Sequence, residues 1–192
     1  MEECMMGKKL SEMTLEELWQ LFPIFLTEHQ ACWKEWYHEE ESLLKRILIK
    51  DVRISHIGST AISSIWAKPI IDILVEVPKE SNLLDYKDLI INSGYICMSQ
   101  SEKGLSFNKG YTENGFAERV FHLHLRYAGD NNELYFRDYL IEFPDVAKEY
   151  EELKLKLWKK YEHNRDAYTN DKSELVKEYT EKARVLYGDR YR

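Results

Sequence analysis

The stretch VRISHIGSTAISSIWAKPIIDILVEV, from Val52 to Val77, decides the fold of this chain. Extended residues lead into the turn His56–Thr60, and the stretch ends in an apolar run, Ile70–Val77, bounded by two prolines. This run is β-branched and too short for a helix, so it predicts a buried strand. Asp72 and Glu76 interrupt the run and share one face of it, because side chains alternate along a strand. Burying two unpaired carboxylates is costly, so they require a metal, a cation or a solvent-filled cleft.

Several sequence blocks carry a family resemblance. The strings HIGSTAI and AKPIIDILVEV are followed by FHLHL, FRDYL and AYTNDK, which begin at Phe121, Phe136 and Ala167. In this order the blocks resemble the GrpB family, which has the nucleotidyltransferase fold of the DNA-polymerase-β-like superfamily. The resemblance covers His56 to Lys172. It implies an α+β fold, in which a mixed β-sheet packs with helices, a long N-terminal helix and a helical C-terminal part.

Composition limits the classes of protein. A length of 192 residues predicts a single domain over 1–192, with 1–13 as a loose tail. The net charge of -7 argues against a general nucleic-acid binder or a protein of anionic membranes. Three widely spaced cysteines, without a CxxC pair, predict reduced thiols. With no apparent signal peptide or membrane span, the expected location is cytoplasmic, and the oligomeric state stays open.

Periodicity and turn signals predict the remaining elements. Thr14 and Glu17 form a capping box that starts a first helix, and Pro23 separates it from a second. The sequence also predicts a turn at Asn114-Gly115. The further expected elements are helices over 24–49, 81–93 (capped by Ser81), 133–142, 145–163 and 171–187, and strands over 95–98, 105–109 and 119–127.

The turn Gly58-Ser59-Thr60 is a candidate for binding nucleotide phosphates. Glycine allows close approach of the backbone, and a helix start after it favours anions. The resemblance implies this role, because a Gly-Ser pair follows the first strand of the nucleotidyltransferase fold. The alternative is an ordinary turn.

Asp72 is the principal candidate site residue. The resemblance implies that acids on this strand hold divalent metal ions against a nucleoside triphosphate. Position 74 carries Leu74 in place of a second acid, and the next acid on that face is Glu76. Either Glu76 or another group substitutes, or one metal suffices, or catalysis is lost. Alternatively, Asp72 is a buried ion-pair partner of Lys68 or Arg126, and Glu76 is an exposed carboxylate.

His122 and His124 project from one face of the strand 119–127. This spacing suits metal ligation, and His124 is expected near Asp72 as a metal ligand, phosphate contact or acid/base. Imidazole ligands would favour zinc or manganese over magnesium. Hydrogen-bonded structural histidines are the alternative.

The candidate phosphate-binding cations are scattered along the chain. Arginine's planar fork suits phosphate oxygens, and lysine acts as a point charge. Arg137 can instead pair with Asp138, and the segment 148–160 reads as a solvated helix face. The candidate cations are Lys68, Arg119, Arg126, Arg137 and Lys172.

Three functions follow as hypotheses. The first is a metal-dependent transferase that moves a nucleotidyl group from a nucleoside triphosphate to a small acceptor. Asp72 and His124 are its catalytic candidates. The second is a catalytically silent nucleotide- or ligand-binding module with the same fold. The third is a metal-dependent phosphohydrolase. The fold alone does not choose among them.

Overall fold

A computed structural model describes residues 8–48 and 51–191. Its elements, in chain order, are η1 (Leu10–Glu12), α1 (Leu15–Leu21), α2 (Cys32–Leu48), β1 (Arg53–Ile57), η2 (Ser59–Ala61), β2 (Ile71–Val77), α3 (Leu84–Asn92), β3 (Ile96–Ser101), β4 (Gly104–Thr112), β5 (Gly115–Tyr127), α4 (Asn132–Glu142), α5 (Pro144–Tyr161), α6 (Arg165–Asp171) and α7 (Ser173–Tyr187).

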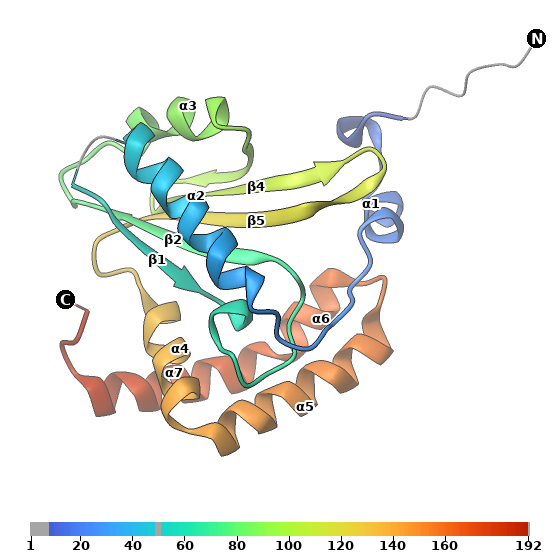
Figure 1. Cartoon of the computed structure of the whole chain (residues 1–192), viewed down its shortest axis with the longest axis vertical. Coiled ribbons are helices and arrows are strands. Elements are labelled where there is room, and N and C mark those ends of the chain that lie inside the picture. The colour runs from blue at the N-terminus through green and yellow to red at the C-terminus, as the bar shows by residue number, and fades with distance from the viewer. Residues whose placement is uncertain (1–7, 49–50, 192) are drawn as a thin grey trace, which may run out of the picture.

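The strands form one sheet in the order β1-β2-β5-β4-β3 (Figure 1). Only β2 and β5 pair in parallel, and the other neighbouring pairs are antiparallel, so the sheet is mixed. The parallel pair is central and buried on both faces, which is why β2 reads as an almost continuous apolar run.

Helices cover both faces of the sheet. On one face, Ile71, Ile73, Val75 and Val77 join the main core with α2 and α3. On the other face, Leu74 packs with residues of β1 and α4. The helices α4 to α7 lie together below the sheet in the view of Figure 1. This architecture confirms the α+β expectation, including a long helix near the N-terminus and a helical C-terminal part.

The structure of the N-terminal segment differs in part from what its hydrophobic periodicity predicts. Thr14 forms the expected capping box, since its side chain accepts from Glu17 N while Glu17 accepts from the Thr14 N–H. The second helix begins at Cys32 rather than at residue 24, because Thr27 pairs with Ala67 as an isolated β-bridge. Tertiary pairing here overrides helical spacing. Position 49 and residues 1–7 of the expected tail lie outside the described part, whereas Lys8 forms an ion pair with Glu17.

Two other boundaries also changed. The third helix begins at Leu84 with Leu83 as its N-cap, and Ser81 does not cap it but accepts a hydrogen bond from the Tyr86 hydroxyl. Asn82 Oδ1 accepts from Leu84 N at 3.1 Å. The segment before α7 forms an additional helix, α6, whose N-cap Asn164 accepts from Ala167 N. A hairpin turn is present where one was expected, but its two turn residues are Glu113 and Asn114, because Thr112 pairs with Gly115, the first residue of β5. Among the described cysteines, Cys32 and Cys97 are free thiols, while Cys4 lies outside the described residues. None of the described helices is long and apolar enough to cross a bilayer.

Candidate functional site

The turn after β1 is held in one conformation by its own polar groups. Thr60 donates its hydroxyl to the Ile70 carbonyl at 3.1 Å, and His56 Nε2 lies 3.0 Å from the same hydroxyl. Gly58 has φ +71°, and a Cβ built there would lie 2.3 Å from Asp72 Oδ2. Glycine is therefore required twice, for the backbone conformation and for the close approach of the carboxylate. The Thr60 hydroxyl is used for structure, so it is not free to hold phosphate.

Asp72 and His122 face each other across the parallel strands β2 and β5. They are register partners, and His122 Nδ1 lies 3.2 Å from Asp72 Oδ1. The other ring nitrogen of His122, Nε2, lies 2.8 Å from the Tyr111 hydroxyl. Both ring nitrogens of His122 are thus engaged. The ion-pair alternative for Asp72 named Lys68 or Arg126, but the residue that contacts its carboxylate is His122.

Burial and neighbouring charge set the protonation states in this cleft. Burial raises the pKa of Asp72, but the His122 hydrogen bond and the charges of His122, His124 and Lys68 outweigh it, so the net pKa is lowered. Burial lowers the pKa of His124 to about 4, against a smaller raising effect from Asp72. At neutral pH the cleft therefore holds an ionised carboxylate beside an uncharged imidazole.

A cavity of about 240 Å³ opens above these residues, between the sheet and the helices α5 and α6. Among the described residues that line it, four carry positive charge and one is a carboxylate. We call this cavity the cation pocket. The turn Gly58–Thr60 and His124 form part of its wall. Its charged lining residues are Lys68, Asp72, Lys154, Arg165 and Lys172.

The half-buried Lys68 and the buried Lys154 of the cation pocket are repelled by neighbouring cations. Burial, together with the charges of Lys172 and Arg165, lowers the pKa of Lys68 to about 7, against a smaller raising effect from Asp72. Burial and Lys172 likewise lower the pKa of Lys154 to about 7. The Tyr168 ring lies 4.9 Å from Lys68 Nζ and 5.2 Å from Lys172 Nζ, which partly stabilises their charge. Such a cluster is short of negative charge, and an anion would stabilise it.

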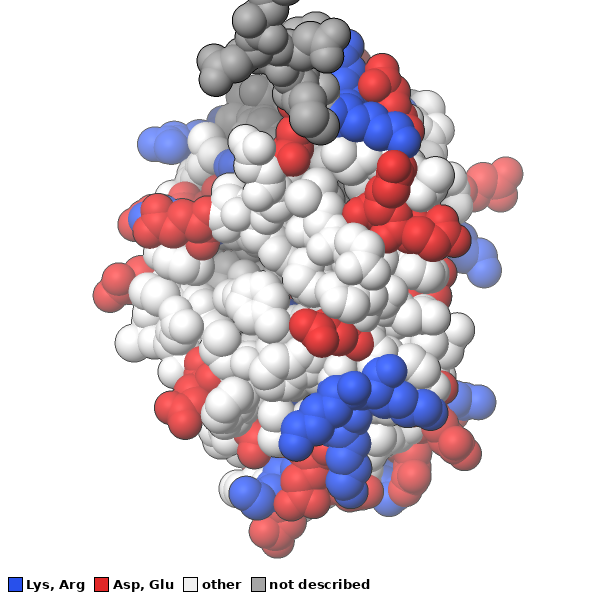
Figure 2. Space-filling view, turned by 90° about the vertical axis from the view of Figure 1, so that its right-hand side faces the viewer, with Lys and Arg blue, Asp and Glu red and all other residues white. Residues whose placement is uncertain are grey.

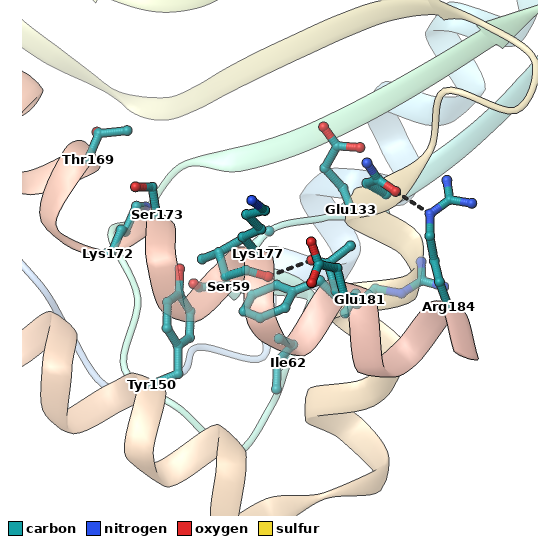
Figure 3. Close-up of a pocket in the computed structure, with 16 residues that line it drawn as sticks. Ser59, Ile62, Glu133, Tyr150, Thr169, Lys172, Ser173, Lys177, Glu181 and Arg184 are labelled. Atoms are coloured by element: carbon teal, nitrogen blue, oxygen red, sulfur yellow. Dashed lines mark hydrogen bonds between the residues drawn. The ribbon is translucent and has the colours of Figure 1, made fainter. Parts of the chain in front are cut away.

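A second cavity, of about 590 Å³, adjoins the cation pocket among α4, α5 and α7. We call it the helical cavity. In Figure 3, Ser59, Tyr150, Thr169 and Lys172 lie along its left-hand side and Glu181 and Arg184 toward its right-hand side. The two cavities adjoin, because both are lined by Gly58, Ser59, Tyr150, Thr169 and Lys172.

The structure corrects the expectation for Glu76. It was expected as a metal ligand on the Asp72 face or as an exposed carboxylate, but it is only 2% exposed. Its carboxylate accepts from Arg53 at 2.5 and 2.7 Å and from Asn131 Nδ2 at 2.8 Å. These partners lie at the far end of β2, in a cavity to which Asp72 does not contribute. Glu76 is a structural ion-pair residue.

Two expected phosphate-binding arginines also have structural partners. Arg126 is the register partner of Glu76 and donates to the carbonyls of Leu105 and Leu125, so it is remote from the cation pocket. Arg119 forms an ion pair with Glu39. Neither side chain lines the cation pocket.

Arg137 combines both earlier interpretations. It pairs with Asp138, as the alternative predicted, and donates to the His56 carbonyl at 2.8 Å. It nevertheless lines the helical cavity, beside the turn Gly58-Ser59. Lys68 and Lys172 lie in the cation pocket, where phosphate-binding cations were expected.

The residues of the cleft fit some metal centres and not others. In the described part of the chain, no three His, Cys, Asp or Glu side chains are grouped to hold a metal ion. His122 has no ring nitrogen to spare, and Glu76 is elsewhere, so a zinc site built from protein ligands does not fit. Magnesium often binds through one carboxylate together with substrate phosphates. Asp72 offers that single carboxylate.

Sequence reasoning missed Lys154 and Arg165. Lys154 falls in the segment 148–160 that read as a solvated face, yet it is 2% exposed and donates to Ser59 Oγ at 3.1 Å. A signal existed, because the buried positions of α5 are Ala147, Tyr150, Lys154 and Leu157, at helical spacing. A lysine on that buried face of the helix indicates a cation that points into the protein. For Arg165 we find no comparable sequence signal.

Comparisons with known proteins agree with this architecture. A family model described as GrpB protein matches residues 23–182. The glutamate-rich protein GrpB of Alkalihalophilus pseudofirmus is 38% identical over 162 residues, which are 81% of this chain and 92% of that protein. YqkA of Bacillus subtilis is 31% identical over 183 residues, or 92% of this chain, but the chain spans only 52% of YqkA.

Solved structures show the same fold. The crystal structure of GrpB from Enterococcus faecalis has a TM-score of 0.74 at 30% identity and covers 85% of this chain and 99% of that one. A structure of the Cid1 poly(U) polymerase with Mg 3'-dATP bound has a TM-score of 0.50 at 14% identity, and covers 82% of this chain and 51% of that one. The fold is therefore nucleotidyltransferase-like. On these matches, the chain belongs to the GrpB family.

Proposed function

We propose that this protein binds a nucleoside triphosphate and transfers its nucleotidyl group to a small acceptor. The observation that carries the proposal is the cation pocket, which places Lys68, Lys154, Arg165 and Lys172 beside the turn Gly58-Ser59. A polyphosphate supplies the negative charge that these side chains lack, and charge-assisted hydrogen bonds to phosphate are among the stronger ones.

The nucleoside part of the ligand is assigned to the helical cavity. It adjoins the cation pocket, and its volume of about 590 Å³ is in the range of small-molecule sites. The Phe136 and Tyr150 rings, 5.2 Å apart, lie in its wall and supply an aromatic surface for a base or sugar. Asn132, Glu181 and Arg184 supply polar groups near its other end.

The transfer step follows from this arrangement. The acceptor's hydroxyl oxygen forms a bond to the α-phosphorus, and the bond from that phosphorus to the β-phosphate oxygen breaks. Pyrophosphate leaves with the electron pair, and the hydroxyl proton passes to the uncharged imidazole of His124. The cations of the pocket stabilise the charge that develops on the phosphate oxygens. A magnesium ion that entered with the triphosphate would neutralise phosphate charge beside Asp72.

A silent binding module is the second candidate, and one observation favours it. Leu74 occupies the position of the second acid and is fully buried against Ile57 and Leu134. Leucine has no metal-ligating atom in any rotamer, so position 74 does not supply the second metal ligand. The silent module keeps the same cation pocket and predicts binding without turnover.

Calorimetric titration of each nucleoside triphosphate, with and without magnesium or manganese, tests the proposal. Lys172→Met removes one cation of the pocket, and Lys182→Met removes an exposed one on α7 as the matched control. We expect affinity to fall at least tenfold in the first variant and to be unchanged in the second. Absence of binding by all four triphosphates to the wild type would reject nucleotide recognition.

Pyrophosphate release then separates the candidate functions. Release that depends on a pool of small hydroxyl compounds supports the transferase. Binding without release supports the silent module. Release of phosphate or pyrophosphate without an acceptor supports the phosphohydrolase.

A further inference from the structure

A third cavity, of about 800 Å³, lies between α1, the hairpin of β4 and β5, and the start of β2. We call it the aromatic cavity. Its walls include Trp19, Phe22, Ile96, Met98, Tyr111 and Phe116. α1 and the turn of the β4–β5 hairpin lie on the right-hand side of Figure 1, which faces the viewer in Figure 2, where a broad uncharged area is interrupted by carboxylates and bordered below by a group of Lys and Arg side chains.

Three rings form one wall of the aromatic cavity. The Phe22 centroid lies 4.7 Å from that of Tyr111 and 5.0 Å from that of Phe116, and Tyr111 and Phe116 are 5.2 Å apart. They come from the segment after α1, from β4 and from β5, so the tertiary fold assembles this wall. A flat aromatic ligand gains both apolar burial and ring–ring contact in such a place.

The inner end of the aromatic cavity is polar and reaches the cation pocket. Lys68, Ile70 and Arg165 line both cavities. Tyr111 connects them as well, because it lines the aromatic cavity while its hydroxyl lies 2.8 Å from His122 Nε2 in the cation pocket. A ligand whose apolar part fills the aromatic cavity therefore has its other end beside the expected phosphate position.

We infer that the aromatic cavity is the acceptor site, and that the acceptor is a flat aromatic small molecule bearing a hydroxyl group. This inference rests on the proposed function. The rings hold the body of the acceptor, and the shared end directs its hydroxyl to the cation pocket. The volume suits a small molecule. A nucleic-acid strand is disfavoured as acceptor because it would need a continuous basic track, whereas the net charge is -7 and the face in Figure 2 carries carboxylates as well as lysines and arginines.

The inference is tested, without any nucleotide, by measuring the affinity of the full chain for 2-naphthol with ligand-observed NMR. Ile96→Trp adds bulk at the cavity wall, and Ile141→Trp is the matched control on α4. The two isoleucines are similarly exposed, at 49% and 55%, but only Ile96 lines the cavity. We expect 2-naphthol to bind the wild type and Ile141→Trp equally, and Ile96→Trp at least fivefold more weakly. Equal binding to all three chains, or none to the wild type, overturns the inference.

A second titration keeps this inference separate from the proposed function. Triphosphate binding is measured on the same three chains without 2-naphthol, and its absence rejects the proposed function whatever 2-naphthol does. Where triphosphate binds, the two ligands are expected to bind together. Competition between them would overturn an acceptor site. So would displacement of 2-naphthol by a short single-stranded RNA, which would assign the cavity to a nucleic acid.

Discussion

The Lys154 ammonium of α5 lies 3.1 Å from the hydroxyl of Ser59 in the turn after β1, although 95 residues separate them in the chain. This contact joins the C-terminal helices to the nucleotidyltransferase-like sheet. It also fixes a buried cation where the ligand's phosphates are expected. The ammonium therefore serves the structure, through hydrogen bonds to the Ser59 hydroxyl and the Trp66 carbonyl, and binding, through its charge.

Lys154→Met tests both roles. Methionine keeps most of the apolar stem but removes the charge, so we expect triphosphate affinity to fall at least tenfold. It also removes the donor to Ser59 and to the Trp66 carbonyl, and relief of the buried charge offsets part of that loss, so the free energy of unfolding should fall by about 1–2 kcal/mol. Lys156→Met, on the exposed side of the same helix, is the control for both calorimetry and urea unfolding. Unchanged affinity in Lys154→Met would contradict its role in binding.

Ligand binding should take up protons near neutral pH. The pKa values of Lys68 and Lys154 are lowered to about 7, and a nearby phosphate favours their charged form. Affinity should therefore weaken as pH rises from about 7 to 9, by up to about tenfold per pH unit for each proton taken up. Titrations in HEPES and in Tris, which differ in ionisation enthalpy, measure the uptake directly. Identical heats in both buffers would contradict the prediction.

The same lysines give the unliganded protein an opposite dependence on pH. An unfolded lysine keeps its ordinary pKa of 10.5, so between about pH 7 and 10 the unfolded state binds more protons than the folded state. Stability then rises with pH, by at most about 1.4 kcal/mol per pH unit for each lysine. Urea unfolding at pH 7, 8 and 9 measures this slope. The wild-type slope should exceed that of Lys154→Met.

Gly58→Ala should be far more damaging than a comparable change elsewhere. Gly58 and Gly129 both have positive φ, but a Cβ at Gly58 would meet Asp72 Oδ2 at 2.3 Å, whereas one at Gly129 would meet nothing within 4 Å. Gly129→Ala should cost about 1–2 kcal/mol for backbone strain alone. Gly58→Ala should cost about 3 kcal/mol or more and abolish triphosphate binding, because the carboxylate must move. Equal effects in chemical unfolding would contradict this account of the turn.

Glu76→Ala should destabilise the protein without affecting the cleft. It leaves Arg53 and Asn131 without their shared acceptor, and we expect a loss of about 2–3 kcal/mol, moderated because Arg53 is partly exposed. Triphosphate affinity should stay within about twofold, an ordinary margin for a site that the residue does not touch. Glu80→Ala, at an exposed carboxylate just beyond β2, is the control. A large loss of triphosphate affinity in Glu76→Ala would contradict this prediction and show that Glu76 contributes to the binding site.

Local signals in the sequence identified most elements and part of the site. The β-branched apolar run between two prolines identified β2, alternation identified β5, and the capping box identified the start of α1. The two strands pair in parallel, and Asp72 and His122 meet as partners on one face. Periodicity failed at residues 24–31, where a β-bridge to Ala67 replaces the expected helix. A long-range contact of that kind leaves no trace in local spacing.

By itself, the sequence determined the strand that carries Asp72 and the glycine turn before it, because each depends on local backbone preference and hydrophobic period, while its family resemblance implied the α+β class. Only the tertiary structure decided which charges meet. It paired Glu76 with Arg53 at one end of β2, and brought Lys154 and Arg165 to Asp72 at the other. Charge pairing depends on distances between residues far apart in the chain, and these distances exist only once the sheet and the C-terminal helices have packed.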